Sequence, residues 1–196
     1  NTAHIGLEEA GVRLTASGHI EVDRVSRTSA RGVYAAGDCT PVFALASVAA
    51  MQGRIAMWHS LGDSVAPLDL RTVSANVFTA PEIATVGCSQ TDIDTGVVRG
   101  LTMMLPLRGN ARAKMQALHD GFVKIFCLPT TGIIVGAVVV APAASELIHP
   151  LSVAVRNKLT VDQLAESFTV YPSLSGSLAE AARRLHGHSS DQVITY

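Results

Sequence analysis

Residues 32–41, with the sequence GVYAAGDCTP, constrain the fold of this chain more than any other segment. The apolar start of the segment predicts a buried strand, which ends in the small residues 35–37 and then in a lone carboxylate, Asp38. Small residues at the end of a strand let a ligand approach the backbone, and an acid at that place accepts hydrogen bonds from sugar hydroxyls. A plain turn, in which Asp38 caps the loop or the following helix, explains the same residues.

A long apolar segment follows at residues 44–61, with the sequence ALASVAAMQGRIAMWHSL. It is rich in Ala, Leu and Met, and its apolar character continues around much of the helical cylinder, which predicts a buried helix. The N-terminus of such a helix offers free N–H groups and the positive end of the helix dipole to an electron-rich group. Together with Asp38, this arrangement suits a cofactor that has hydroxyls and a reducible ring.

Two shorter patterns precede this pair, and a linker follows it. Residues 7–14, LEEAGVRL, indicate a helix end closed by Gly11, and residues 19–22, HIEV, alternate like a strand. Residues 62–70, GDSVAPLDL, have the composition of a linker. We therefore expect three parts: a domain of residues 1–66, a domain of residues 67–186 and a tail of residues 187–196.

Beyond the linker the periodicity changes toward two, which predicts an α+β domain with an antiparallel sheet. The β-rich runs are residues 72–79, 83–88, 101–108, 114–119, 122–128 and 132–141. The sequence PTTG at residues 129–132 predicts a hairpin turn between the last two runs. Helices are expected at residues 143–159 despite Pro150, at residues 161–167 after a Thr160 cap, and at residues 177–185.

The composition argues against several classes of protein. The 196 residues are 48% hydrophobic with a mean hydropathy of +0.32, which is too apolar for disorder. Fifteen Lys and Arg against sixteen Asp and Glu, with no basic block, argue against a nucleic-acid partner. The longest apolar run, residues 133–144, is too short for a membrane span.

Three widely spaced cysteines form neither a CxxC pair nor a disulfide framework, which predicts a cytoplasmic location. Because the sequence starts with NTAHIG instead of Met, we expect a fragment.

Several motifs, taken in order, resemble one enzyme family. Residues 28–56 resemble the second flavin-binding segment of the pyridine nucleotide–disulfide oxidoreductases, the class that contains dihydrolipoamide dehydrogenase and glutathione reductase. Further phrases match along the chain: NTAHIGLEEAGV, NVFTAPEIATVG, GNARA, GFVKI and ASELI. The resemblance covers nearly all of residues 1–186. It implies the fold class α/β and α+β, namely the end of the FAD/NAD(P)-binding region followed by an α+β interface domain.

The resemblance also implies a cofactor, a co-substrate and an assembly. Gly37 and Asp38 would meet the pyrophosphate–ribitol region of FAD, with Asp38 on a ribitol hydroxyl. The backbone N–H groups of Leu45, Ala46 and Ser47 would face the N1/C2 edge of the flavin and favour its reduced form. NAD(P)H would be the co-substrate, and the interface domain would form a homodimer in which each subunit completes the other's flavin site. The Gly-rich phosphate loops of the family lie upstream, and this chain has no GxGxxG.

One segment departs from the family pattern, at residues 170–178, VYPSLSGSL. Related disulfide reductases carry His-Pro-Thr-x-x-Glu here, and this His–Glu dyad shuttles protons for reactive thiols. In this chain Tyr171 stands at the His position and Gly176 at the Glu position. Tyrosine, with an ordinary pKa of about 10, is a poor base near neutrality. The family's cis peptide bond is expected at Tyr171-Pro172, where it would turn the Tyr171 ring inward to wall the flavin face.

Other residues with reactive side chains receive structural interpretations. His149 falls inside the helix expected at residues 143–159, and His186 and His188 lie in a polar tail, so no metal site is expected. Cys39 adjoins Asp38, and we interpret it as an inert buried thiol.

Three functions remain open at this point. The first is a flavoenzyme that passes hydride from NAD(P)H through FAD to a quinone-type small molecule, because such an acceptor needs no thiol relay. The second is a dihydrolipoamide dehydrogenase-like disulfide reductase whose proton handling has moved elsewhere. The third is a non-catalytic dimerisation module, which the intact AAGD motif and the helix after it argue against. We favour the first.

Overall fold

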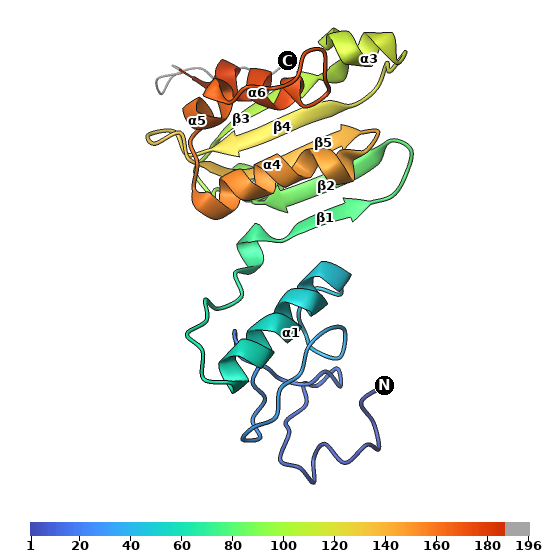
Figure 1. The fold of residues 1–196 in the computed structure, drawn as a ribbon, viewed down its shortest axis with the longest axis vertical. Helices are drawn as coiled ribbons and strands as arrows, with labels where there is room; N and C mark the ends of the chain where they lie inside the picture. Colours follow the sequence, from blue (N-terminus) through green and yellow to red (C-terminus); the bar gives the residue numbers. More distant parts are fainter. Residues whose placement is uncertain (187–196) are drawn as a thin grey trace. The chain divides into compact units, whose positions relative to one another are not determined.

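The computed structural model describes residues 1–186, and the chain divides into two compact units. The first unit spans residues 1–70 and contains one helix, α1 (Ala46–Ser60). The second begins at Arg71 and contains a five-stranded sheet with helices packed on it. Figure 1 labels these elements. The mixed α/β and α+β fold class is confirmed, and so is the helix expected at residues 44–61.

The segment before α1 consists of turns and isolated β-bridges. The strand expected at residues 32–37 is wrong, since Tyr34 makes only a bridge to Arg27. Residues 19–22 likewise form only a bridge, between Ile20 and Leu14. An extended segment becomes a strand only beside a neighbour that continues the ladder of hydrogen bonds. Within residues 1–70 each of these segments meets too short a partner for a ladder.

The helix expected to end near Gly11 is a single closed turn. Gly11 has φ of +78°, its N–H donates to the Glu8 carbonyl at 2.9 Å, and the Val12 N–H donates to the Leu7 carbonyl at 2.9 Å. This pair of bonds is the Schellman arrangement that ends helices. The prediction that Gly11 closes this segment is therefore confirmed. The prediction of a helix before Gly11 is wrong, because the segment forms only one turn.

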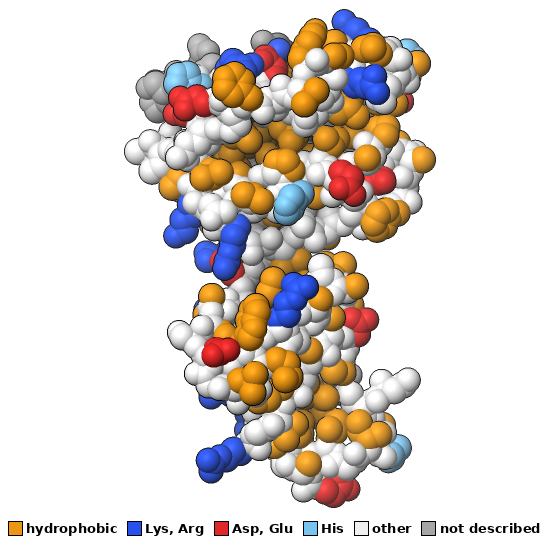
Figure 2. All heavy atoms as spheres, viewed as in Figure 1, with side chains coloured by type: hydrophobic (Ala, Val, Ile, Leu, Met, Phe, Trp, Pro, Cys, Tyr) orange, Lys and Arg blue, Asp and Glu red, His pale blue; other side chains and the backbone are white. Residues whose placement is uncertain are grey.

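Helix α1 buries one face instead of its whole circumference. Its buried residues are Val48, Gln52, Ile55 and Ala56, which recur at helical spacing. Apolar residues on other faces are exposed, with Met57 60% and Trp58 48% accessible. The expectation of a fully buried helix is therefore wrong for this chain. Figure 2 shows hydrophobic side chains at the surface of the molecule.

The sheet of the second unit is antiparallel throughout, as the alternating pattern predicts. Its strands are β1 (Ser74–Val77), β2 (Glu82–Gly87), β3 (Leu101–Pro106), β4 (Phe122–Cys127) and β5 (Ile134–Ala141). They are ordered β1-β2-β5-β4-β3, so β5 lies at the centre. The hairpin turn expected at residues 129–132 joins β4 to β5 and is confirmed: the Gly132 N–H donates to the Leu128 carbonyl at 2.9 Å.

Helices α4 (Ala144–Asn157), α5 (Val161–Glu166) and α6 (Gly176–Leu185) confirm the three expected from the sequence. Helix α4 covers β1, β2 and β5, and α6 covers β3 and β4, so both lie on one face of the sheet (Figure 1). Thr160 caps α5 as expected, because its side chain accepts from the Gln163 N–H in a capping box. The core between helices and sheet includes Ile125, Val139 and Leu151, all 0% exposed.

Two short helices were not expected. Residues 114–119 were predicted as a strand, but α3 (Ala111–Met115) occupies part of this segment. Asn110 starts α3 by accepting hydrogen bonds from the Arg112 and Ala113 N–H groups, and this cap overrides the weak alternation. Helix α2 (Gln90–Asp94) begins with a Ser89–Asp92 capping box. Two 3-10 turns, η1 (Leu70–Thr72) and η2 (Leu107–Gly109), complete the elements of residues 1–186.

Among residues 1–186, no helix combines the length and the apolar character needed to cross a membrane.

Candidate functional site

The turn that carries Asp38 is built on Gly37. Gly37 has φ of +87°, a backbone conformation that favours glycine. Its carbonyl accepts both the Thr40 N–H at 2.9 Å and the Thr40 Oγ1 hydroxyl at 2.8 Å, which closes the turn. Asp38, next in the chain, is exposed. The turn therefore exposes the Asp38 carboxylate.

The N-terminus of α1 lies a few residues further along the chain and has no side-chain cap. Leu45 is the N-cap residue with extended backbone, and its own N–H donates to the Phe43 carbonyl at 2.8 Å. The first intrahelical bond runs from the Ala49 N–H to the Leu45 carbonyl at 2.9 Å. The N–H groups of Ala46 and Ser47 therefore have no partner within the helix and point toward its positive end. Of the three predicted N–H groups, that of Leu45 is engaged within the chain.

The structure brings the turn against α1. The Gly37 N–H donates to Oε1 of the buried Gln52 at 2.9 Å, and Nε2 of Gln52 donates to Oγ1 of Thr40 at 3.3 Å. A Cβ on Gly37 would lie 3.4 Å from the Ala49 Cβ. Gly37 and Asp38 are thus held beside the first turns of α1, where Ala46 and Ser47 lie. Gln52 was missed from the sequence; its only signal was a polar residue on the apolar face of a helix.

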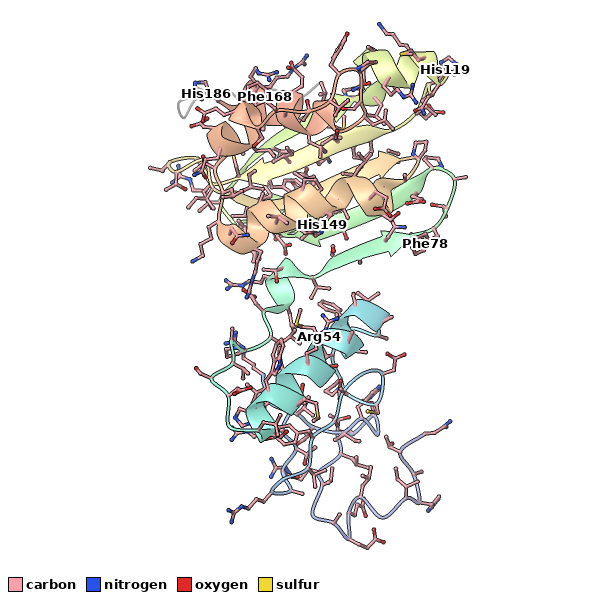
Figure 3. All side chains as sticks on the ribbon, viewed as in Figure 1. Arg54, Phe78, His119, His149, Phe168 and His186 are labelled. Carbon is pink, nitrogen blue, oxygen red and sulfur yellow. The ribbon has the colours of Figure 1, made fainter. Side chains whose placement is uncertain are left out.

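Tyr171 and Pro172 belong to the second unit, whereas Asp38 belongs to the first. The peptide bond between them is cis, as expected. The Tyr171 side chain is 85% exposed, so the expected inward orientation is not seen within a single chain. Tyr171 ends a run of exposed residues, 166–171, which we call the projecting segment and in which Phe168 and Val170 are 106% and 78% exposed. Figure 3 labels Phe168.

Asn110 holds the segment that follows Tyr171. Its Nδ2 donates to the Ser173 carbonyl at 2.9 Å and to Ser177 Oγ at 2.8 Å, while its Oδ1 caps α3. The Ser173 hydroxyl accepts the Gly176 N–H at 3.2 Å. All the hydrogen-bonding capacity of the Asn110 amide is therefore used to fix residues 173–177 against α3.

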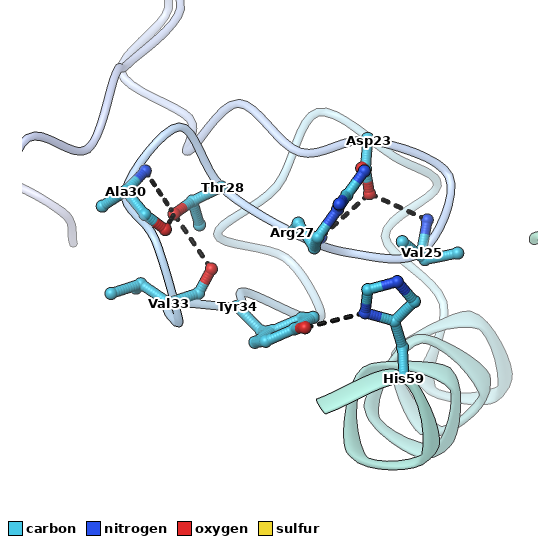
Figure 4. A network of polar contacts seen from close by, with 8 residues as sticks. All are labelled: Asp23, Val25, Arg27, Thr28, Ala30, Val33, Tyr34 and His59. Carbon is cyan, nitrogen blue, oxygen red and sulfur yellow. Dashed lines mark hydrogen bonds and ion pairs between the residues drawn. The ribbon is translucent and has the colours of Figure 1, made fainter. Parts of the chain in front are cut away.

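A polar network joins the approach to the Asp38 turn with the end of α1 (Figure 4). Tyr34 Oη lies 2.7 Å from His59 Nδ1, and the two rings are 5.8 Å apart between centroids. Nearby, Asp23 accepts from the Val25 N–H and from Arg27 Nε. Although burial by itself raises the pKa of Asp23, these hydrogen bonds outweigh it and lower the pKa below its usual value.

The cysteines do not form a reactive thiol pair among the described residues. All three are free, and burial raises the pKa of both Cys88 and Cys127 to about 11, so both are protonated near neutrality. Cys39 is half-buried, with Sγ 3.4 Å from the Ala36 carbonyl oxygen.

Two of the three histidines discussed in the sequence analysis, His149 and His186, lie at the surface. His149 is exposed on α4 (Figure 3), and His186 lies beside Asp162 with 2.5 Å between Nδ1 and Oδ1. His188 lies outside the described residues. Within residues 1–186, no three His, Cys, Asp or Glu side chains gather as metal ligands would.

Family models match both units. The model for the pyridine nucleotide-disulphide oxidoreductase dimerisation domain matches residues 73–182, and that for the pyridine nucleotide-disulphide oxidoreductases matches residues 1–53. The chain belongs to the pyridine nucleotide-disulphide oxidoreductase family, whose members use FAD and NAD(P)H.

Individual relatives agree with this assignment. The chain is 62% identical over 188 residues to an NAD(P)H dehydrogenase (quinone) of Mycobacterium tuberculosis, an alignment that covers 96% of the chain and 38% of the relative. It is 38% identical to a mercuric reductase of Acidithiobacillus ferrooxidans, covering 93% of the chain and 33% of the relative. The chain thus spans well under half the length of either relative.

The fold has close counterparts among solved structures. The crystal structure of LpdA from Mycobacterium tuberculosis matches with a TM-score of 0.92 and 62% identity, covering 94% of this chain and 40% of that one. The flavoprotein disulfide reductase RclA from Escherichia coli matches with a TM-score of 0.85 at 24% identity, covering 93% and 42%. The second likeness concerns the fold alone.

Proposed function

We propose that this chain is part of an FAD-dependent oxidoreductase that passes hydride from NAD(P)H through the flavin to a quinone-type acceptor. The observation that carries the proposal is the Gly37–Asp38 turn held against the uncapped N-terminus of α1. The name of the Mycobacterium tuberculosis relative, NAD(P)H dehydrogenase (quinone), supports the choice of acceptor. The proposed division is residues 1–66 for the FAD/NAD(P)-binding region, residues 67–186 for the interface domain and residues 187–196 for a tail. The proposal includes a cytoplasmic homodimer.

The first unit fits FAD in three respects. Gly37 has the positive φ that favours glycine, and its lack of a side chain lets the turn pack close to Ala49 of α1, beside the helix N-terminus that would face the cofactor. The exposed Asp38 carboxylate accepts a hydrogen bond from a ribitol hydroxyl. The Ala46 and Ser47 N–H groups direct positive partial charge at the electron-rich edge of the ring. Because the Leu45 N–H is engaged by Phe43, its role is to set the backbone that starts the helix.

The chemistry that FAD supplies when bound is the transfer of hydride from NAD(P)H to the acceptor. The residues of this chain orient the cofactor and stabilise the negative charge that reduction brings to the ring edge near Ala46 and Ser47.

Tyr171 is the proposed contact to the acceptor, with Pro172 fixing the backbone beside it. A flat aromatic ring stacks on a planar acceptor, and the Tyr171 hydroxyl donates to a carbonyl oxygen that gains charge on reduction. Because Tyr171 and Gly176 stand where related disulfide reductases have His and Glu, we propose that no thiol relay operates. Burial raises the pKa of Cys88 and Cys127 to about 11, so neither of these two thiols would serve as a relay thiolate near neutrality.

The FAD assignment predicts that Asp38→Ala weakens cofactor binding. Loss of a hydrogen bond to a charged group costs about 1.5–3 kcal/mol, which corresponds to a 10- to 150-fold rise in the FAD dissociation constant. The measurement is titration of the full-length apoprotein with FAD by flavin fluorescence. Asp63→Ala, at an exposed aspartate outside the turn, is the matched control and is expected to leave the constant unchanged. Tight flavin retention by the Asp38→Ala protein would remove this residue from the site.

The acceptor assignment predicts selective turnover. The full-length enzyme is expected to reduce quinones with NAD(P)H but not lipoamide or glutathione disulfide, because no imidazole base stands at position 171. Tyr171→His combined with Gly176→Glu is expected not to create disulfide reductase activity by itself. Steady-state rates with each acceptor decide the matter. Rapid lipoamide reduction by the unmodified enzyme would favour a dihydrolipoamide dehydrogenase-like activity, and no turnover with any acceptor despite bound FAD would favour a dimerisation module.

A further inference from the structure

Gln52 is a buried polar residue whose amide oxygen and amide nitrogen both form hydrogen bonds. The side chain is 1% exposed in the middle of α1, on the same face as Val48 and Ile55. A buried amide is costly unless it is hydrogen-bonded, and here Oε1 accepts the Gly37 N–H at 2.9 Å while Nε2 donates to Thr40 Oγ1 at 3.3 Å. Both partners belong to the turn that carries Asp38.

The hydrogen bonds close a ring around the turn. Thr40 Oγ1, which accepts from Gln52, donates its own proton to the Gly37 carbonyl at 2.8 Å. Gly37 is therefore held at its N–H by Gln52 and at its carbonyl by Thr40, and Thr40 is 1% exposed. The Ala49 side chain, one helical turn before Gln52, packs at 3.4 Å from where a Gly37 Cβ would lie. The position of Asp38 is thus tied to the axis of α1 through side-chain contacts.

We propose that Gln52 is a positioning residue for FAD: it fixes the Asp38 turn relative to the N-terminus of α1, so that both engage the same cofactor. This inference rests on the proposed function, because it assigns Gln52 a role toward the same ligand. Gln52 contacts the turn and not the ligand. Its contribution is pre-organisation, since two binding groups held at a fixed separation lose less conformational freedom on binding.

The chemistry of the site selects glutamine. One atom must accept from a backbone N–H and another must donate to a hydroxyl, and the uncharged amide does both. Methionine has a similar size and shape but offers no donor and only a weak acceptor. The Gln52→Met change therefore removes the hydrogen bonds while it keeps the buried volume.

The test is FAD titration of the full-length apoprotein carrying Gln52→Met. Loss of a buried hydrogen-bonded connection is expected to raise the FAD dissociation constant about tenfold. The midpoint potential of the bound flavin is expected to become more negative, because the Ala46 and Ser47 N–H groups are then less firmly placed against the reduced ring. Gln116→Met, at an exposed glutamine after α3, is the matched control and is expected to change neither quantity.

Variants of Thr40 separate positioning from simple packing. Thr40→Val keeps the shape and removes the hydroxyl, so it is expected to weaken FAD binding about as much as Gln52→Met, whereas Thr40→Ser is expected to retain affinity. Because both residues act through one ring of bonds, the Gln52→Met and Thr40→Val effects are expected to be non-additive. The Thr40 pair also provides the test if Gln52→Met does not fold.

The outcomes distinguish this inference from the proposed function. If the unmodified full-length protein binds no FAD, the proposed function fails and the inference fails with it. If the unmodified protein binds FAD, while Gln52→Met or Thr40→Val leaves both the dissociation constant and the potential unchanged, only the inference is overturned. Fully additive effects of Gln52→Met and Thr40→Val would also overturn it.

Discussion

Replacing Gly87 with alanine is expected to lower the free energy of unfolding by about 2–5 kcal/mol, a large fraction of the stability of a domain. Gly87 ends β2 with φ of +72°, and a Cβ there would lie 2.2 Å from the Val135 carbonyl oxygen and 2.8 Å from the Gly136 Cα. These are backbone atoms of the central strand β5 and cannot move without breaking the β2–β5 ladder. Conformational strain and overpacking therefore act at one position.

The measurement is chemical unfolding of the full-length protein, with far-UV circular dichroism as the readout. Gly109→Ala is the matched control in the same unit, because a Cβ on Gly109 meets nothing within 4 Å and Gly109 has no positive φ. Its effect is expected to stay within about 0.5 kcal/mol. Equal stability of the Gly87→Ala and Gly109→Ala proteins would contradict the prediction. It would show that the β2–β5 ladder can shift to accommodate a Cβ at position 87 without loss of stability.

The sequence predicted best those features whose causes lie close together in the chain. The antiparallel sheet follows from alternation within each strand, and the Thr160 cap and the turn at residues 129–132 each depend on a few neighbouring residues. The strand expected at residues 32–37 failed because a strand also needs a partner, which no local pattern supplies. The strand expected at residues 114–119 failed because a strong cap at Asn110 outweighed weak alternation.

The same distinction applies to the candidate site. Gly37, Asp38 and the N-terminus of α1 could be proposed together from the sequence because they lie within one short segment. Gln52 and Asn110 were missed because their partners are selected by the folded chain: Gln52 binds Gly37 across 15 positions, and Asn110 binds Ser173 across 63. A polar residue at an apolar helical position is the signal that would have identified Gln52.

The largest functional effect is expected from the projecting segment, which ends at Tyr171. Phe168 and Val170 are 106% and 78% exposed within a unit that matches the family's dimerisation domain. Together with Tyr171, which is 85% exposed, they place three exposed apolar side chains within four residues, and such a group marks an interaction surface where a single exposed residue does not. A two-fold partner is the occupant that a dimerisation domain implies. We expect this segment to pack against the second subunit, where Tyr171 would reach the partner's flavin.

Phe168→Asp combined with Val170→Asp is therefore expected to raise the dissociation constant of the homodimer about a thousandfold or more, since two buried anchors contribute about 2 kcal/mol each. Quinone turnover is expected to fall with the dimer, because each flavin site would lose the Tyr171 contact from the other subunit. Light scattering after size-exclusion chromatography, together with steady-state rates, measures both effects on the full-length protein.

Val97→Asp, at a valine that is 74% exposed elsewhere in the same unit, is the matched control and is expected to leave the dimer intact. A stable monomer of the unmodified protein with full quinone reductase activity would show that each flavin site is complete within one subunit, and Tyr171 would then lose its proposed contact with the acceptor.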